Sequence, residues 1–145
     1  MAMQTSLYER DFYAWTVETA EALKNKAFNQ IDIDHLREEV ESMGAREKSE
    51  LKNRLAVLIA HLLKWQYQPD RQGKSWRLTI KEQREELSDL LEDNPSLKSK
   101  INDTLPKTYT RALNKAIKET DLEELIFPEA LPYTLDQLLD DNYLP

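Results

Sequence analysis

Apolar positions recur at intervals of three and four residues along most of the chain, which is the period of an amphipathic α-helix. The first helical stretch starts with Ser6 and Glu9, which have the spacing of a capping box. Turn and cap residues over 29–34 separate it from a short second helix. The first helix is expected to turn Tyr8, Phe12, Trp15, Ala22 and Leu23 toward a core. The face of the second helix holds Leu36, Val40 and Met43.

Gly44 is expected to break or bend the chain before a third helix over residues 46–67. The third helix is apolar around most of its circumference, which is typical of a central, buried helix. A fourth helix is predicted over residues 75–91. The apolar positions in register on the third helix are Leu51, Leu55, Leu58, Leu62 and Trp65. The inward positions of the fourth are Trp76, Ile80, Leu87 and Leu90.

Proline positions divide the remainder of the chain. Asn94 and Pro95 mark a new helix start, and Pro106 predicts a kink or a second start within that helix. The pairs at 127–128 and 131–132 predict a stiff, extended connection before a short helix over 135–139, which Thr134 caps. We therefore expect an all-α, single-domain helical bundle over residues 1–145. It has four or five main helices and an irregular C-terminal segment, about 121–145, packed over the bundle.

Composition agrees with this fold class. The 145 residues contain only two glycines and are 40% hydrophobic, which favours a folded helical domain over disorder or a sheet. The chain has no cysteine, so disulfides and thiolate chemistry are excluded. No apolar run approaches a membrane span, and residues 1–9 lack the pattern of a signal peptide. A cytoplasmic location without membrane contact is the expectation.

The net charge of −7 is unevenly distributed. Residues 64–84 hold six basic side chains against two acidic ones, whereas every charged side chain from Glu119 onward is acidic. The overall acidity makes nucleic-acid binding unlikely. Complementary charge and the apolar residues of the tail predict that residues 119–141 pack back near the basic segment.

Polar side chains on the apolar stripes are the candidate site residues. Arg54 and His61 share one stripe of the third helix, where they could position an anion or move a proton, or bond at the edge of a core. Gln83 lies within the stripe of the fourth helix, so we expect it to be buried and bonded to Arg54, His61 or Glu39. The candidate polar cluster comprises Glu39, Arg54, His61, Gln83 and Arg84.

Other chemistry has weaker support. His35 and Glu39 have the spacing to share a metal, but only two histidines occur in the chain, so neither a metal nor a cofactor is expected. There is no glycine-rich phosphate loop and no serine-hydrolase motif. Tryptophans 65 and 76 lie among basic residues, which suits either a base-stacking platform or two core side chains with solvated neighbours.

Several segments resemble domain-of-unknown-function family 29, small bacterial proteins that are especially abundant in cyanobacteria. The resemblance covers nearly the whole chain, in order, and departs from the family at Asn25 and Lys26, where relatives more often carry a glycine and a basic residue. It implies an all-helical domain and supplies no activity or catalytic residue. The segments that carry it include LYERDFYAW at 7–15, LREEVES at 36–42, HLLKWQYQP at 61–69, SWR at 75–77 and FPE at 127–129.

Two functions remain open from the sequence. The leading one is a non-catalytic interaction or regulatory module, whose partner is expected to be a protein. The alternative is a small enzyme, hydrolase or nuclease-like, that acts on a phosphorylated or nucleic-acid substrate. In that enzyme the candidate polar cluster would line the pocket, with Glu39 as a base. An open cleft that joins those side chains favours the enzyme, and a sealed core with paired polar groups favours the module.

Overall fold

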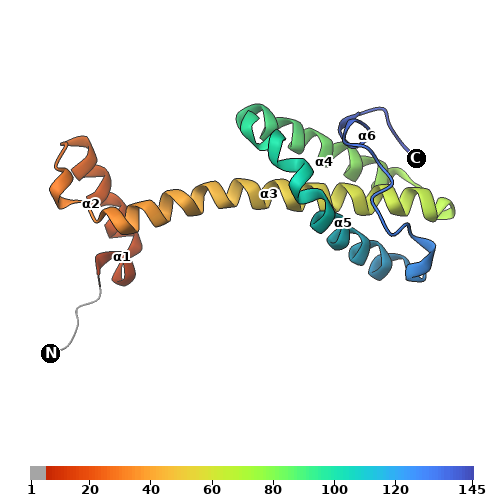
Figure 1. Cartoon of the computed structure of the whole chain (residues 1–145), viewed down its shortest axis with the longest axis horizontal. Helices are drawn as coiled ribbons and strands as arrows, with labels where there is room; N and C mark the ends of the chain where they lie inside the picture. Colours follow the sequence, from red (N-terminus) through yellow and green to blue (C-terminus); the bar gives the residue numbers. More distant parts are fainter. Residues whose placement is uncertain (1–5) are drawn as a thin grey trace. The chain divides into compact units, whose positions relative to one another are not determined.

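The computed structural model describes residues 6–145, and within them the regular elements are all helical. This confirms the all-α class, and the four long helices α2 to α5 are the expected main helices. The α-helices are α1 (Leu7–Arg10), α2 (Phe12–Lys24), α3 (Ile33–Tyr67), α4 (Lys74–Asp93), α5 (Lys98–Thr120) and α6 (Leu135–Leu139) (Figure 1). Short 3₁₀ turns occupy Phe28–Gln30, Pro69–Arg71, Pro95–Leu97 and Glu124–Ile126.

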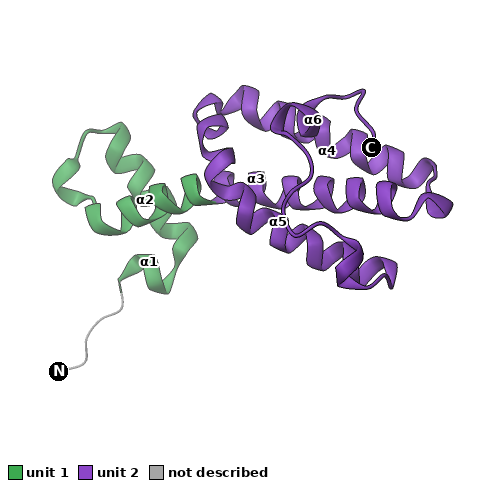
Figure 2. Ribbon diagram, turned by 45° about the vertical axis from the view of Figure 1, so that its right-hand side comes forward, with its two compact units in different colours: residues 1–45 green, residues 46–145 purple. Residues whose placement is uncertain are grey.

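The chain groups into two compact units (Figure 2). Unit 1 lies within residues 1–45 and unit 2 comprises residues 46–145. Helix α3 supplies its first turns to unit 1 and the rest to unit 2. We expected one domain over residues 1–145. The division into two compact units does not test whether they fold as one domain, so a single domain stays a prediction.

Helix α3 corrects the expected break at Gly44. It is one continuous helix of 35 residues, because a glycine within a helix costs only about 1 kcal/mol relative to alanine. The neighbours of Gly44 are strong helix formers, including Met43, Ala45 and Arg46. Helix α5 likewise continues through Pro106, so no second start occurs there.

Two of the three predicted N-caps, Ser6 and Thr134, make the expected side-chain bonds, whereas the Asn94 side chain donates back to the Leu90 carbonyl and caps no helix start. The Ser6 hydroxyl accepts from the Glu9 backbone amide at 3.3 Å, which begins α1. Thr134 and Gln137 form a complete capping box at the start of α6. These bonds satisfy backbone amides that a helix start leaves without intrahelical partners.

The end of α2 has a Schellman motif. The amide of Ala27 donates to the Ala22 carbonyl at 2.8 Å, and the amide of Lys26 donates to the Leu23 carbonyl at 3.1 Å. Lys26 has φ 57°, the left-handed conformation that glycine adopts without strain. Lys26 therefore occupies a position of special backbone geometry at the end of α2.

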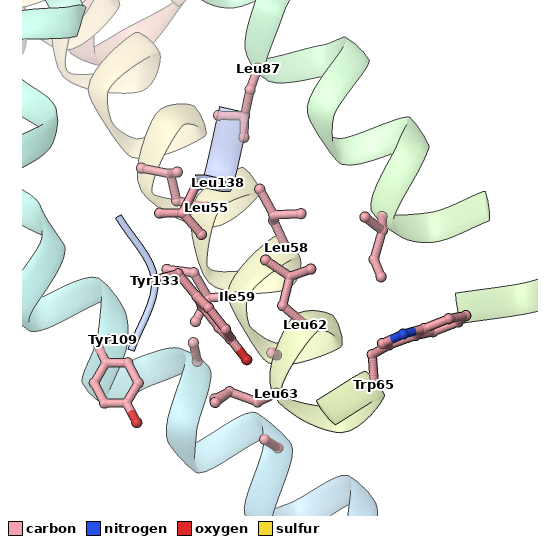
Figure 3. Packing of buried hydrophobic residues seen from close by; sticks show 14 of the residues in the cluster. Leu55, Leu58, Ile59, Leu62, Leu63, Trp65, Leu87, Tyr109, Tyr133 and Leu138 are labelled. Atoms are coloured by element: carbon pink, nitrogen blue, oxygen red, sulfur yellow. The ribbon is translucent and has the colours of Figure 1, made fainter. Parts of the chain in front are cut away.

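The apolar core of unit 2 is built around α3 (Figure 3). Helices α4, α5 and α6 and the C-terminal segment pack on it. Trp65 is 8% exposed, as predicted, whereas Trp76 is only partly buried, which corrects the expectation that it is largely buried. The large side chains that α3 buries completely are Leu51, Leu55, Leu58, Ile59, Leu62 and Leu63.

The C-terminal segment packs over unit 2, as the charge pattern predicted. Phe127, Tyr133 and Leu138 are buried in the core cluster. The Tyr133 hydroxyl donates to Gln66 Oε1 at 2.9 Å. At the start of the acidic stretch, Glu119 accepts from Lys64 Nζ at 2.7 Å. Apolar burial therefore holds the segment, and the ion pair of Glu119, in the last turn of α5, joins α5 to α3.

Unit 1 buries far less. Its buried side chains are Trp15, Thr19 and Ala22, all on one face of α2. Phe12 and Leu23, which we expected in a core, are both exposed. Of the second expected core face, Val40 and Met43 are exposed and Leu36 is half-buried, so most of that face is not in a core. No helix within residues 6–145 has the length and apolarity that crossing a membrane requires.

Candidate functional site

Arg54 and Gln83 meet, as their positions on facing apolar stripes predicted. Gln83 is 8% exposed, and its Oε1 accepts from Arg54 Nη1 at 3.5 Å. The guanidinium also donates from Nε to Glu50 at 2.8 Å and lies 3.8 Å from Glu86. The hydrogen bond to Glu50 is the main reason why the pKa of Arg54 is raised. Arg54 is thus a charge-paired bridge between α3 and α4.

His61 bonds within its own helix. Its Nδ1 donates to the Val57 carbonyl at 2.9 Å, one turn earlier in α3. Burial lowers the pKa of this imidazole, so the neutral form is favoured. The geometry is that of a histidine satisfied at the edge of a core.

Arg84 holds the C-terminal segment. It is 3% exposed, and its guanidinium donates to three backbone carbonyls. The distances are 2.9 Å to Leu138, 2.8 Å to Tyr143 and 3.1 Å to Gln137. Burial lowers the pKa of Arg84, because desolvation disfavours the charged form. All three nitrogens of this side chain are engaged in structural bonds.

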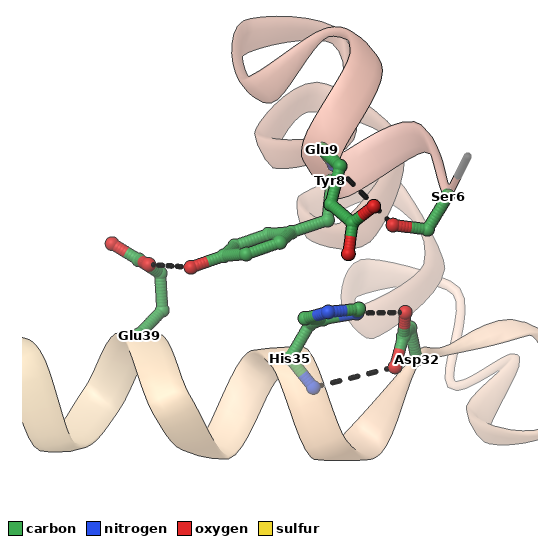
Figure 4. A network of polar contacts seen from close by, with 6 residues as sticks. All are labelled: Ser6, Tyr8, Glu9, Asp32, His35 and Glu39. Carbon is green, nitrogen blue, oxygen red and sulfur yellow. Dashed lines mark hydrogen bonds and ion pairs between the residues drawn. The ribbon is translucent and has the colours of Figure 1, made fainter.

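Glu39 belongs to unit 1, where it accepts from the Tyr8 hydroxyl at 2.6 Å (Figure 4). That bond is the largest cause of the rise in the pKa of Tyr8 to about 12. The Tyr8 ring stacks on His35 with centroids 4.2 Å apart, and His35 Nδ1 lies 2.5 Å from Asp32 Oδ2. Asp32 also accepts from the His35 amide at 3.3 Å, which caps the start of α3. This network fastens α1 to the first turns of α3 within unit 1.

The structure brings together two of the five candidate side chains, Arg54 and Gln83. His61 and Arg84 have separate partners in unit 2, and Glu39 has its partner in unit 1. Arg84 bonds to backbone carbonyls, which every residue has. The sequence therefore could not predict that Arg84 holds the C-terminal segment. Each side chain has a structural bond that accounts for its position.

The aromatic and basic residues at the end of α3 and the start of α4 cover one another. Lys64 Nζ lies 5.2 Å from the Trp76 ring centre, and the Arg77 guanidinium lies 6.0 Å from that of Trp65. Cation–π contacts of this kind stabilise the fold by about 0.5–2 kcal/mol each. With one ring buried and both rings covered by cations, this region is poorly suited to stacking on bases.

Within residues 6–145, no three His, Cys, Asp or Glu side chains lie close enough together to hold a metal ion. His35 and Glu39, which the sequence paired as possible ligands, bond instead to Asp32 and Tyr8. These bonds join parts of unit 1.

Unit 1 contains a feature that the sequence did not predict, a half-open pocket of about 440 Å³. Apolar and acidic side chains line it together, among them Leu7, Trp15, Glu18, Glu21, Ala22 and Asp32. A mixture of carboxylates and apolar walls is suited to a cation on an apolar stem. These residues are unevenly spaced in the sequence and form no motif, so the sequence did not predict the pocket.

Unit 1 also contains most of the exposed large hydrophobic side chains of the described residues. Of the twelve large hydrophobic side chains that are exposed in residues 6–145, eight lie in unit 1. They are Phe12, Tyr13, Val17, Leu23, Phe28, Ile33, Val40 and Met43. Apolar side chains concentrated in this way mark interaction surfaces. The signal in the sequence is that α2 has apolar residues on opposite sides.

Charge distinguishes unit 1 as well. Residues 6–45 contain nine acidic and four basic side chains, a formal net charge of −5 out of −7 for the whole chain. The exposed apolar residues therefore lie in a negative field, which attracts basic groups and repels acidic ones.

Comparison with known proteins identifies one family. The model of a domain of unknown function, DUF29, matches residues 7–144. No curated protein and no solved structure matches the chain.

Proposed function

Because the chain belongs to the DUF29 family, whose description assigns no activity, we propose a function from its geometry: a non-catalytic module that binds another protein through unit 1. The observation that carries this proposal is the contrast between the two units. Unit 2 has a sealed apolar core, whereas within residues 6–45 unit 1 buries only Trp15, Thr19 and Ala22 and exposes eight large hydrophobic side chains. Binding of a partner over such a surface is favourable, because it removes apolar side chains from water.

The enzymatic alternative has less support. A hydrolase or nuclease-like pocket would need the candidate polar cluster to converge on one open space. Gln83 and Arg84 are buried, and each is occupied by a structural bond. His61 donates its Nδ1 proton to its own helix. These bonds favour the module.

Within the same proposal we place the module in the cytoplasm, with a protein as its partner and neither nucleic acid nor membrane involved. The net charge of −7 supports the exclusion of nucleic acid, since phosphate backbones carry the same sign. Fractionation of cells with an antibody against the chain tests the location.

The test of partner binding uses site-specific photo-crosslinking in the native cell. A photoreactive residue at Val17, in unit 1, should give a discrete crosslinked protein. The matched control places the same residue at Leu125, which is also exposed but lies in unit 2. A discrete product from position 17 alone supports the proposal, and identical products from both positions, or none from either, overturn it.

A further inference from the structure

The half-open pocket of unit 1 lies beside the covered face of α2. Trp15, Thr19 and Ala22, which are the buried side chains of α2, all line it. Leu7 adds an apolar group from α1, and Ala27 adds one from the turn that follows α2. This part of the wall is largely apolar and suits a hydrocarbon stem.

Carboxylates line the pocket beside that apolar wall. Around α2, Glu18 and Glu21 lie about 60° and about 120° from Trp15 in the same direction. Asp32 lines the pocket from the residues just before α3, so three of the described lining residues are acidic and none of them is basic. Lys24, the basic residue of α2, lies about 180° from Trp15, on the far side of the helix. The pocket is therefore a place where a cation is attracted.

Two polar groups of the wall have no partner among residues 6–145. The Glu18 carboxylate makes no hydrogen bond or ion pair there. Trp15 is 6% exposed, and its buried indole Nε1 makes no hydrogen bond. Buried donors are nearly always paired, so an unpaired donor on a side chain that lines a pocket points to an acceptor from outside the chain. The acidic group and the indole group thus indicate independently that a ligand completes the pocket.

We propose that this pocket binds an organic cation, an ammonium or guanidinium group on an apolar stem. The stem packs along Trp15 and Ala22, and the cation lies among the carboxylates. The inference goes beyond the function proposed above, because it concerns a ligand pocket on the covered side of α2 and not the exposed apolar side chains. The source of the cation is either a free amine or a lysine or arginine side chain of a partner protein.

Other ligands fit the pocket less well. A metal ion needs ligands that converge on one point, and no three His, Cys, Asp or Glu side chains of residues 6–145 do so. An anion is repelled by the carboxylates. The volume of about 440 Å³ is in the range of small-molecule pockets and exceeds what a bare ion needs.

Asp32 connects the pocket to a histidine. It lines the pocket, and it bonds through Oδ1 to the amide and through Oδ2 to the ring of His35, which stacks on Tyr8 (Figure 4). The bond to Asp32 is the largest cause of the raised pKa of His35, and the charges of Glu38 on α3 and Glu9 on α1 act in the same direction. A second cation near Asp32 opposes protonation of the ring, so binding should lower the pKa of His35. By linkage, the cation binds more tightly where His35 is neutral.

The experiment follows the imidazole protons of both histidines of the full chain by NMR as a probe is added. One probe is lysine blocked with acetyl and methylamide groups, which represents a residue of a protein, and another is aminopentanol, which represents a free amine. Both carry an oxygen acceptor. Norleucine blocked in the same way as the lysine provides a similar stem without the charge. His61, in unit 2, is the internal control.

The protein variant is Glu18→Gln, which removes one carboxylate of the pocket. Its matched control is Glu41→Gln, because the Glu41 side chain is 71% exposed and lies in unit 1 outside the lining of this pocket. Both variants change the net charge of unit 1 by the same amount, so a difference between them reports position and not total charge.

At least one charged probe should shift the His35 signals saturably and lower the pKa of His35, while His61 does not respond and norleucine has no effect. The dissociation constant should rise roughly two- to fivefold in Glu18→Gln, as for one exposed charge pair, and stay unchanged in Glu41→Gln. Tighter binding of the blocked lysine than of aminopentanol assigns the cation to a partner protein, and the reverse order assigns it to a free amine.

Three results would overturn the inference. They are no response of His35 to either charged probe, an equal response to norleucine, and equal weakening in the two variants, which would show nonspecific attraction. The crosslink at position 17 tests the exposed surface of unit 1 separately. A discrete crosslink together with any of these three results leaves the proposed module in place and removes only the pocket as a ligand site.

Discussion

Replacing Arg84 tests how strongly the C-terminal segment is fixed. The Arg84→Met substitution preserves much of the side-chain length and apolar stem and removes the donors to the carbonyls of Gln137, Leu138 and Tyr143. Hydrogen bonds from charged groups each contribute about 1.5–3 kcal/mol. Their sum is offset by the desolvation of the guanidinium, which is 3% exposed.

We expect Arg84→Met to lower the free energy of unfolding by about 2–4 kcal/mol, because the bond to the Leu138 carbonyl is fully buried and that oxygen loses its partner. The two part-buried carbonyls regain water, which keeps the loss below the sum of three bonds. Urea unfolding followed by tryptophan fluorescence and circular dichroism measures the change.

The matched control is Lys81→Met on the same helix. Lys81 is exposed and lies 4.0 Å from Glu85, so its loss should change stability by no more than about 0.5 kcal/mol. In Arg84→Met, a protease should also cleave within residues 121–145 faster than in the control. Equal stability of the two variants, or unchanged protection of the segment, would refute the role assigned to Arg84.

Three further expectations follow from other positions. Gly44→Ala should raise stability by about 0.5–1 kcal/mol in urea unfolding, because its φ is not positive and an added Cβ meets no atom within 4 Å; a loss of stability would contradict the helix geometry. Trp65→Ala should cost about 3–5 kcal/mol, and an unchanged thermal melt would mean that the ring is exposed. In an NMR titration His35 should have a pKa above 6.5, chiefly through its bond to Asp32, and His61 should have one below 6.5 through burial. The stabilisation from His35 is then complete below pH 6.5 and is lost as pH rises through its raised pKa. The same bond lowers the pKa of Asp32. The stabilisation from Asp32 is therefore present above its ordinary pKa of 3.8 and is lost as pH falls through the lowered pKa. The reverse order of the two histidines would show the assignment to be wrong.

The helical class and the caps at Ser6 and Thr134 were predictable because each depends on a local pattern. Thr134 and Gln137 have the spacing of a capping box, and the phase of Gln83 within an apolar stripe required a partner such as Arg54. Periodicity reports which residues share a side of a helix, and these predictions needed nothing more.

Other features depend on what lies opposite an element, which periodicity does not report. Phe12 and Leu23 are in phase with Trp15, yet they are exposed because unit 1 supplies too little chain to cover them. Helix α3 continues past Gly44 because the helix propensity of its neighbours outweighs the cost of one glycine, and periodicity does not report these energies. The candidate polar cluster did not assemble as one group because each member had a nearer partner.

The buried positions of Phe127, Tyr133 and Leu138 have a consequence for biosynthesis. Chains are made from the N-terminus at about 5–20 residues per second, so α3, α4 and α5 leave the ribosome before the residues that seal their common core. Until then, the carbonyls that accept hydrogen bonds from Arg84 are missing, and the side chains of α3 that pack against the tail are exposed to other proteins. The nascent protein therefore passes through an interval in which chaperones have a binding surface, and any product that terminates before Phe127 would keep that surface and be a substrate for proteolysis.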